Sequence, residues 1–288
     1  MNQNIAIIGG DLRIVNLAKI LANDGYKINV FALEKVAQLE NLKNIKGFNS
    51  IEDAIEDVDI IISSIPFSKN NIVLNTPFCD KEIELNRFTE IIKGKRLIAG
   101  GIRKETLDVL TKNNVEVIDL LKYEELTILN TISTAEGALQ IAMEETTKTI
   151  FNSNVLVLGF GRVGKTVANK FKSLGANIYC EARKQDDLAW IKTYGYIPIN
   201  LENIDEYLSK FDIIINTIPA MIIDEKRLNL IKRECLIIDL ASAPGGVDFE
   251  KAKEKKIKAI LALALPGKVA PETSAEFIKE ILYKIIKK

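Results

Sequence analysis

Residues 154–164 read Asn-Val-Leu-Val-Leu-Gly-Phe-Gly-Arg-Val-Gly, an apolar run followed by three glycines in a G-x-G-x-x-G pattern. The apolar run predicts a buried strand, and the apolar positions Val163, Val167 and Phe171 predict a helix over 163–174. A strand, a glycine turn and a helix in this order form the phosphate-binding loop of dinucleotide folds, where the positive end of the helix faces the phosphates. We therefore predict a pyrophosphate site made by Gly159, Gly161, Arg162, Val163 and Gly164, the alternative being a tight turn without a ligand.

The next predicted strand, residues 177–181, indicates which dinucleotide would bind. In NAD-binding folds an acidic residue about 20 positions beyond the glycines binds the ribose 2′-hydroxyl. Here Ala182 stands 23 positions after Gly159, and Arg183 and Lys184 follow it. Two cations suit a 2′-phosphate, so the sequence favours NADP. Two alternatives stay open: NAD, if Glu181 points at the ribose, and a solvated turn at the two cations.

Short apolar segments alternate with amphipathic ones along the whole chain, which predicts parallel sheets with helices on both faces. Helices are clearest at 163–174, 185–194 and 271–287. Strands are expected near 4–8, 28–32, 59–63, 96–99 and 115–118 in the first half, and near 154–158, 177–181, 196–199, 212–216, 235–239 and 257–262 in the second.

The two halves resemble each other. The segment IAIIGG at 5–10 matches VLVLGFG at 155–161 in style, and DIIISSIP at 59–66 nearly repeats as DIIINTIP at 212–219, so the two offsets are 150 and 153 positions. Paired features at a nearly constant offset indicate two domains of one topology. The fold class expected is α/β, with two Rossmann-like, doubly wound parallel-sheet domains and a cleft between them; chance likeness of two generic buried strands is the alternative.

The predicted domain boundaries lie on either side of a helical stretch at 130–150. We expect a first, substrate-binding domain over 1–133, a dinucleotide-binding domain over 134–270, and a C-terminal helix, 271–288, that returns to brace the first. Ser133 followed by Glu136 fits a capping box at the start of the connecting helix.

Composition narrows the function. Of 288 residues 47% are hydrophobic and 27% charged, and Lys+Arg and Asp+Glu both total 39, so no net charge attracts nucleic acid or an anionic membrane. No signal peptide or membrane span is expected, and the three cysteines (Cys79, Cys180, Cys235) fit a reducing cytoplasm without a disulfide framework or a metal site. The chain has no histidine, so any proton transfer must use another group.

Strand ends indicate where a substrate would bind. The first half has Gly9-Gly10-Asp11 without a third glycine in register, which makes a poor dinucleotide site, whereas Arg13 and Ser64 suit a compact anionic substrate. In the second half Lys268 follows the last strand, and the exit Thr217, Ile218 and Pro219 is expected along the nicotinamide riboside.

Six segments carry a resemblance over nearly the whole chain: IAIIGGDLR at 5–13, TISTAEGALQIA at 131–142, VLVLGFGRVGKTVA at 155–168, INTIPAMI at 215–222, IIDLASAPGGVDF at 237–249 and ALPGKVAPETSA at 264–275. The sequence resembles the family of dipicolinate synthase A subunits from spore-forming bacteria. That resemblance implies an enzyme in the mother cell of a sporulating bacterium that works with a flavoprotein-like second subunit, the B subunit. Together they would oxidise a dihydrodipicolinate-type intermediate to pyridine-2,6-dicarboxylate with NADP.

On that resemblance we assign candidate catalytic roles to Ser133, Glu136 and Lys268, and candidate substrate contacts to Arg13, Ser64 and Thr134. Glu136 acts either as an acid or base or only as the capping partner of Ser133. Two other functions stay open: an NADP-dependent reductase of another small oxo-acid or imine, and a cofactor-binding subunit whose partner performs the chemistry.

Overall fold

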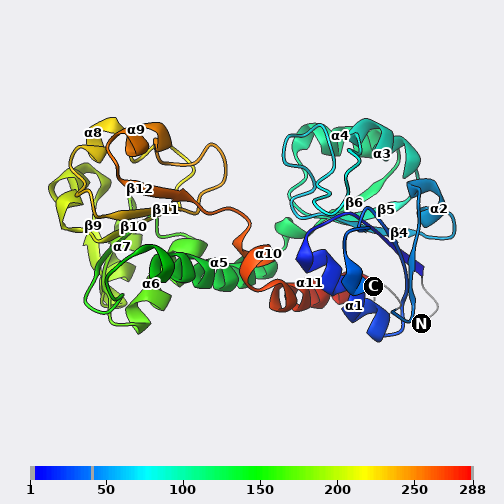
Figure 1. Cartoon of the computed structure of the whole chain (residues 1–288), viewed down its shortest axis with the longest axis horizontal. Helices are drawn as coiled ribbons and strands as arrows, with labels where there is room; N and C mark the ends of the chain where they lie inside the picture. Colours follow the sequence, from blue (N-terminus) through cyan, green and yellow to red (C-terminus); the bar gives the residue numbers. More distant parts are fainter. Residues whose placement is uncertain (1–3, 40–41, 287–288) are drawn as a thin grey trace. The chain divides into compact units, whose positions relative to one another are not determined.

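The computed structural model describes residues 4–39 and 42–286 and divides into two compact units (Figure 1). Unit 1 comprises the chain up to Leu129 together with the segment from Ala270 onward, and unit 2 is Asn130–Val269. The first division falls four residues before the predicted boundary at 133, and the second one residue before the predicted boundary at 270. Each unit is a parallel sheet covered by helices.

Unit 1 contains a six-stranded parallel sheet in the order β3-β2-β1-β4-β5-β6. Its strands are β1 (Asn4–Ile8), β2 (Lys27–Phe31), β3 (Ile45–Gly47), β4 (Ile60–Ser63), β5 (Arg96–Ala99) and β6 (Glu116–Asp119). Its helices are α1 (Leu12–Asn23), η1 (Ala37–Leu39), α2 (Ile51–Ile55), α3 (Leu85–Ile91), α4 (Lys104–Lys112), η2 (Leu120–Lys122) and α11 (Pro271–Ile286).

Alternation along the strands builds two cores in unit 1. Ile5 and Ile7 of β1 pack with α1 and α11 on one face, whereas Ala6 and Ile8 pack with α2, α3 and α4 on the other. Helix α11 is joined to the end of α1 by a salt bridge from Lys279 to Asp24, with an N–O distance of 2.6 Å. The C-terminal segment therefore folds with unit 1.

Unit 2 repeats the topology, with a six-stranded parallel sheet in the order β12-β11-β10-β7-β8-β9. Its strands are β7 (Asn154–Leu158), β8 (Asn177–Glu181), β9 (Ile197–Ile199), β10 (Ile213–Asn216), β11 (Leu236–Asp239) and β12 (Lys258–Leu261). Its helices are α6 (Arg162–Ser173), α7 (Gln185–Thr193), η3 (Leu201–Glu206), η4 (Leu208–Lys210), α8 (Glu225–Leu228), α9 (Phe249–Glu254) and α10 (Leu265–Val269). Helix α5 (Glu124–Glu145) begins in the last residues of unit 1 and continues into unit 2.

Two sheets of one strand order confirm the predicted fold class, in which the first strand of each sheet lies between the second and the fourth. In unit 2, Val155 and Val157 of β7 pack with α5, α6 and α7, whereas Leu156 and Leu158 pack with the opposite layer. Each of the eleven predicted strands overlaps an observed one. The prediction missed β3, a three-residue edge strand whose middle residue is Lys46.

The predicted capping box was wrong. Ser133 and Glu136 lie inside α5, because that helix begins at Glu124, where two acidic residues, Glu124 and Glu125, suit the positive helix end. The Ser-x-x-Glu spacing also occurs along one face of a continuous helix, so it does not mark a helix start by itself. Within the described residues no helix has the length and apolar character needed to cross a membrane.

Candidate functional site

The glycine loop of unit 2 has the shape that a bound pyrophosphate needs. Gly159 follows β7 with φ +88°, a left-handed conformation that glycine adopts without strain. A Cβ on Gly164 would overlap the carbonyl of Gly159, so only glycine lets α6 approach β7 this closely. A Cβ on Gly161 would meet nothing within 4 Å, which leaves the loop open at the N-terminus of α6. The loop therefore fits the diphosphate of a dinucleotide.

The exit from β10 lies against this loop. The amide and the hydroxyl of Thr217 both donate to the carbonyl of Leu158, at N–O and O–O distances of 3.0 and 2.8 Å. A Cβ on Gly159 would lie 2.7 Å from Thr217 Oγ1 and 3.0 Å from Ile218 Cγ1. The structure thus brings the predicted residues Gly159, Thr217 and Ile218 together, with Pro219 exposed beside them.

A buried polar pair that the sequence analysis missed joins the exits of β10 and β11. Asn216 donates through Nδ2 to Asp239 Oδ1 at 2.8 Å, and its Oδ1 accepts from the amide of Ile218. The Asp239 carboxylate also accepts from the amides of Ala241 and Gly246, at 3.0 and 2.8 Å. The pair fixes both loops relative to the sheet. Polar residues ending two buried strands, in IIIN and LIID, were the available signal.

Glu181, the last residue of β8, is turned inward. It is 1% exposed, and its Oε2 accepts from the amide of Gly159 at 3.1 Å. Its other oxygen, Oε1, is buried without a hydrogen-bond partner among the described residues. Burial raises the pKa of the Glu181 carboxyl above its usual range, against the opposing effects of the Gly159 amide and the charges of Arg183 and Arg227.

The turn after β8 presents the two predicted cations to solvent. Ala182 is buried, whereas Arg183 and Lys184 are exposed, and Lys184 precedes the first residue of α7. In the described part of the chain neither side chain makes a salt bridge or a hydrogen bond. Both are therefore available to an anionic group at this end of the sheet.

The candidate catalytic residues of unit 2 lie on α5 and α10. Ser133 is buried and Thr134 donates to the carbonyl of Asn130 at 2.8 Å, the back-bond common for hydroxyls inside helices. Glu136 is paired with Lys170 of α6 at 2.8 Å. Lys268 is exposed on α10, three residues after Leu265, which packs against Gly137 of α5.

The candidate substrate residues of unit 1 are engaged within the fold. Arg13, 4% exposed, forms a salt bridge to Asp11 at 2.7 Å and donates to the carbonyl of Ile65. Ser64 is fully buried and donates to the carbonyl of Asn75 at 2.7 Å. Both side chains hold the loops that leave β1 and β4 in place.

The glycine turn of unit 1 is closed by its own chain. The Gly10 amide donates to the Asn75 carbonyl at 3.3 Å, and a Cβ on Gly9 would meet the Thr76 side chain at 2.6 Å. Ile14 stands where a third glycine would be needed and lies against Gly10. This turn therefore lacks the open, glycine-lined approach that unit 2 has.

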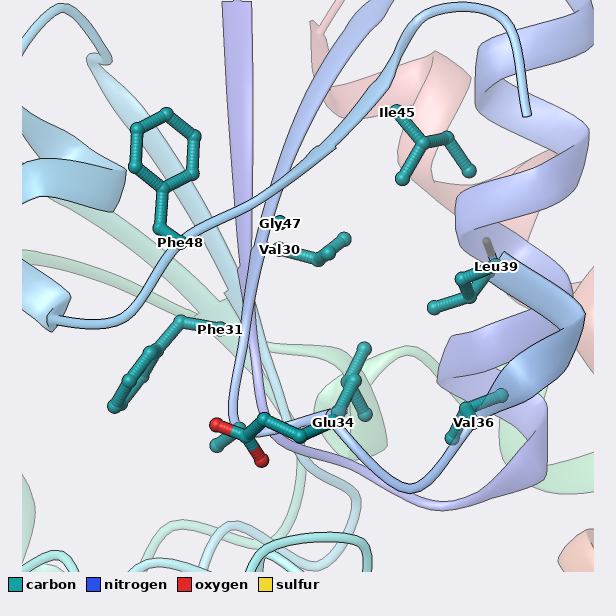
Figure 2. A pocket seen from close by; sticks show the side chains of 10 residues that line it. Val30, Phe31, Glu34, Val36, Leu39, Ile45, Gly47 and Phe48 are labelled. Atoms are coloured by element: carbon teal, nitrogen blue, oxygen red, sulfur yellow. The ribbon is translucent and has the colours of Figure 1, made fainter. Parts of the chain in front are cut away.

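A pocket of about 210 Å³ lies at the ends of β2 and β3 in unit 1 (Figure 2). Val30, Leu39 and Ile45 face one another across it. The single titratable residue among those that line it is Glu34, whose negative charge would repel a phosphate. The pocket does not fit a nucleotide phosphate.

Comparisons with known proteins agree with this division. Residues 4–121 match the family model of the N-terminal domain of the dipicolinate synthase A subunit. Residues 131–250 match the model of the NAD binding domain of D-isomer specific 2-hydroxyacid dehydrogenases. The second match supports a nicotinamide cofactor in unit 2.

Whole-chain relatives extend the likeness over both units. The chain is 33% identical over 284 residues to the A subunit of dipicolinate synthase from Bacillus subtilis (strain 168), covering 98% of this chain and 95% of the relative. The crystal structure of the same subunit from Bacillus halodurans superposes with a TM-score of 0.89 at 31% identity, covering 100% of this chain and 99% of the other. The corresponding structure from Bacillus subtilis gives 0.86 at 31% identity, covering 100% and 96%.

Proposed function

We propose, from the premise that this chain belongs to the family of dipicolinate synthase A subunits, that it oxidises a dihydrodipicolinate-type substrate to pyridine-2,6-dicarboxylate with NADP. The observation that carries the proposal is full-length similarity to the relatives bearing that name, combined with an intact phosphate loop in unit 2. The family name further supports a second subunit, the B subunit, as partner, and a role in the mother cell of a sporulating bacterium.

The choice of NADP rests on the end of β8. Ala182 stands where NAD-binding folds carry an acid, and Arg183 and Lys184 follow it as exposed cations. Glu181 was the residue that kept NAD open, and its carboxyl is buried on the amide of Gly159 instead of facing solvent. A relative in part of the chain also favours NADP: Shikimate dehydrogenase (NADP(+)) of Methanococcus maripaludis is 29% identical over 157 residues, 46% of this chain and 52% of the relative.

The reaction removes two hydrogens from the substrate ring, one as a hydride and one as a proton. Bound NADP would supply the hydride acceptor and become NADPH. The loop Gly159–Gly164 would hold the diphosphate through backbone amides, and Arg183 and Lys184 would pair with the 2′-phosphate. The Asn216–Asp239 pair would keep Thr217, Ile218 and Pro219 in place along the nicotinamide riboside. Positioning of this kind supplies much of the rate of a hydride transfer.

The ring becomes aromatic as the proton leaves, so a modest base is sufficient in a chain without histidine. We propose Glu136, Lys268 and Ser133 for the proton and Thr134 for the substrate. Glu136 is already close to a cation, Lys170, which favours its ionised, proton-accepting form. Arg13 and Ser64 remain proposed substrate contacts, and that role requires them to exchange their present partners, Asp11 and the carbonyls of Ile65 and Asn75.

The test is NADPH formation by the purified chain with freshly generated dihydrodipicolinate, with and without the B subunit, and with NAD⁺ in parallel. We expect 340-nm absorbance from NADPH, a weaker signal from NAD⁺, and none with a panel of unrelated oxo-acids. Reduction that occurs only with the oxo-acids would show a reductase of a different substrate. No reduction in any mixture would contradict the proposal.

The function as a mere binding subunit is distinguished by Gly161. A bulky residue such as valine at this open position would obstruct the diphosphate without a clash inside the fold. Loss of activity of the complex in Gly161→Val is the expected result. An unchanged rate would leave the chemistry to the partner.

A further inference from the structure

Glu181 is the buried carboxyl nearest to the start of the phosphate loop, and the reaction described above does not use it. Its Oε2 holds the amide of Gly159, the first residue of the loop. Its Oε1 has no partner in the described part of the chain and is enclosed. A buried carboxylate oxygen without a donor is unfavourable unless it gains a proton or a partner.

Few charges surround this carboxyl. The neighbouring strands β7 and β9 carry no titratable side chain in Asn154–Leu158 or Ile197–Ile199. The cations that act on it are Arg183, on the turn after β8, and Arg227, on α8. Arg227 is held by Asp205 at 2.9 Å and by the carbonyl of Ile222 at 2.8 Å, so its charge is largely neutralised. Arg183 is therefore the cation that favours the ionised form of Glu181 most freely.

We propose that Glu181 is a positioning residue of the phosphate loop, and that a dinucleotide binds with uptake of a proton on this carboxyl. The proposal depends on dinucleotide binding in unit 2 and not on the identity of the substrate.

Binding changes the charges around Glu181 in one direction. The diphosphate brings negative charge to the N-terminus of α6, next to Gly159, and a 2′-phosphate would also engage Arg183. Both changes disfavour the ionised carboxyl, and burial already raises the pKa of Glu181 in the free chain. A proton on Oε1 removes the charge, while Oε2 still accepts the Gly159 amide and keeps the loop in shape.

The sign of the pH dependence follows. The complex binds more protons than the free chain, so affinity is highest at low pH and falls as pH rises between the free and the bound pKa of Glu181. The slope cannot exceed about tenfold in Kd for each pH unit, because a single group titrates.

The experiment uses isothermal calorimetry of the full chain with NAD⁺ from about pH 5.5 to about pH 8.5, a range that spans raised carboxyl pKa values. NAD⁺ is the probe because it lacks the 2′-phosphate, whose own ionisation near pH 6 would complicate the profile. Pairs of buffers with different ionisation enthalpies give the number of protons taken up. We expect uptake of up to about one proton and a Kd that rises with pH.

Three variants separate the roles. Glu181→Gln keeps an acceptor for Gly159 without a charge, and should bind at every pH about as the wild type does at low pH, without proton uptake. Glu181→Leu removes the acceptor and should bind more weakly at every pH, so that only the conservative variant rescues affinity. Glu202→Gln, an exposed residue of the same unit, should keep the wild-type profile.

Binding by the wild type without proton uptake would overturn the proposal, and so would a Glu181→Gln profile identical to that of the wild type. The wild-type uptake decides the matter alone if Glu181→Gln does not fold. Proton-linked NAD⁺ binding that is lost in Glu181→Gln, together with no oxidation of dihydrodipicolinate, would support the role of Glu181 and contradict the proposed function. A chain that binds neither NAD⁺ nor NADP⁺ would overturn both.

Discussion

At the scale of single residues, Arg183 is the side chain on which the choice of dinucleotide depends most. It is exposed directly after β8, next to the buried Ala182, where an acid would select NAD. A charge-assisted hydrogen bond contributes about 1.5 to 3 kcal/mol, which corresponds to about 10- to 100-fold in affinity. We predict that Arg183→Ala raises the Kd for NADP⁺ by that factor and changes the Kd for NAD⁺ less than about twofold, as measured by calorimetry.

A matched control is Lys192→Ala, which removes an exposed cation from the last turn of α7 in the same unit. It should leave both constants unchanged, because net charge alone acts weakly at a distance in salt solution. Equal weakening of NADP⁺ and NAD⁺ by Arg183→Ala would assign the residue to the diphosphate and remove the main support for NADP.

At the scale of elements, the strand β7, the glycine loop and the helix α6 form one device in which each glycine has its own function. In Gly164→Ala the new methyl group would overlap the Gly159 carbonyl, so α6 must move away from β7. Overpacking of this kind costs about 1 to 3 kcal/mol of unfolding free energy. We predict a clear fall in the thermal midpoint together with loss of dinucleotide binding.

Gly161→Ala is the matched variant. Gly161 has φ −80°, which alanine adopts, and its Cβ meets nothing within 4 Å, so the thermal midpoint should be unchanged or slightly higher. The methyl group faces the approach of the diphosphate, so dinucleotide affinity should still fall. Wild-type affinity in Gly161→Ala would mean that the diphosphate does not approach the loop at this point.

These elements also show why the sequence was informative in some places and silent in others. The loop Gly159–Gly164 was predictable because the steric reasons for its glycines are local to one turn. Glu181 was not, because the direction of a side chain at a strand end depends on pairing with the neighbouring strand, here Leu158 opposite Glu181. Asp239 likewise gains its partners from three segments, ending at Asn216, Ala241 and Gly246.

The errors have physical causes as well. Ser133 and Glu136 fit a capping box by spacing, but α5 starts earlier, at Glu124. Strand β3 was missed because three residues at a sheet edge, with Lys46 in the middle, give no apolar run. The candidate residues Arg13 and Ser64 lie at strand ends as expected, yet their polar atoms are bonded to their own unit, which no spacing in the sequence reveals.

At the scale of the whole molecule, one topology is used twice with different consequences at the glycine turn. In unit 2 the turn is open at Gly161. In unit 1, Ile14 lies against Gly10, whose amide is already paired with the Asn75 carbonyl. The strand order is the same in both, so the difference lies in the few residues that line the turn.

Hydrogen exchange on the complete chain tests this division of labour. A dinucleotide at about 100 times its Kd stabilises the binding-competent state by about 2.7 kcal/mol, so amides that contact it should exchange more slowly. We predict slower exchange at 159–164, 182–184 and 217–219 when NADP⁺ is added, because the amides and cations that fit it lie there. Peptides covering 9–13 should exchange at an unchanged rate, because their turn is closed by Asn75 and Thr76. Slower exchange at 9–13 with no change at 159–164 would place the dinucleotide in unit 1, and then the opening at Gly161 would need another ligand.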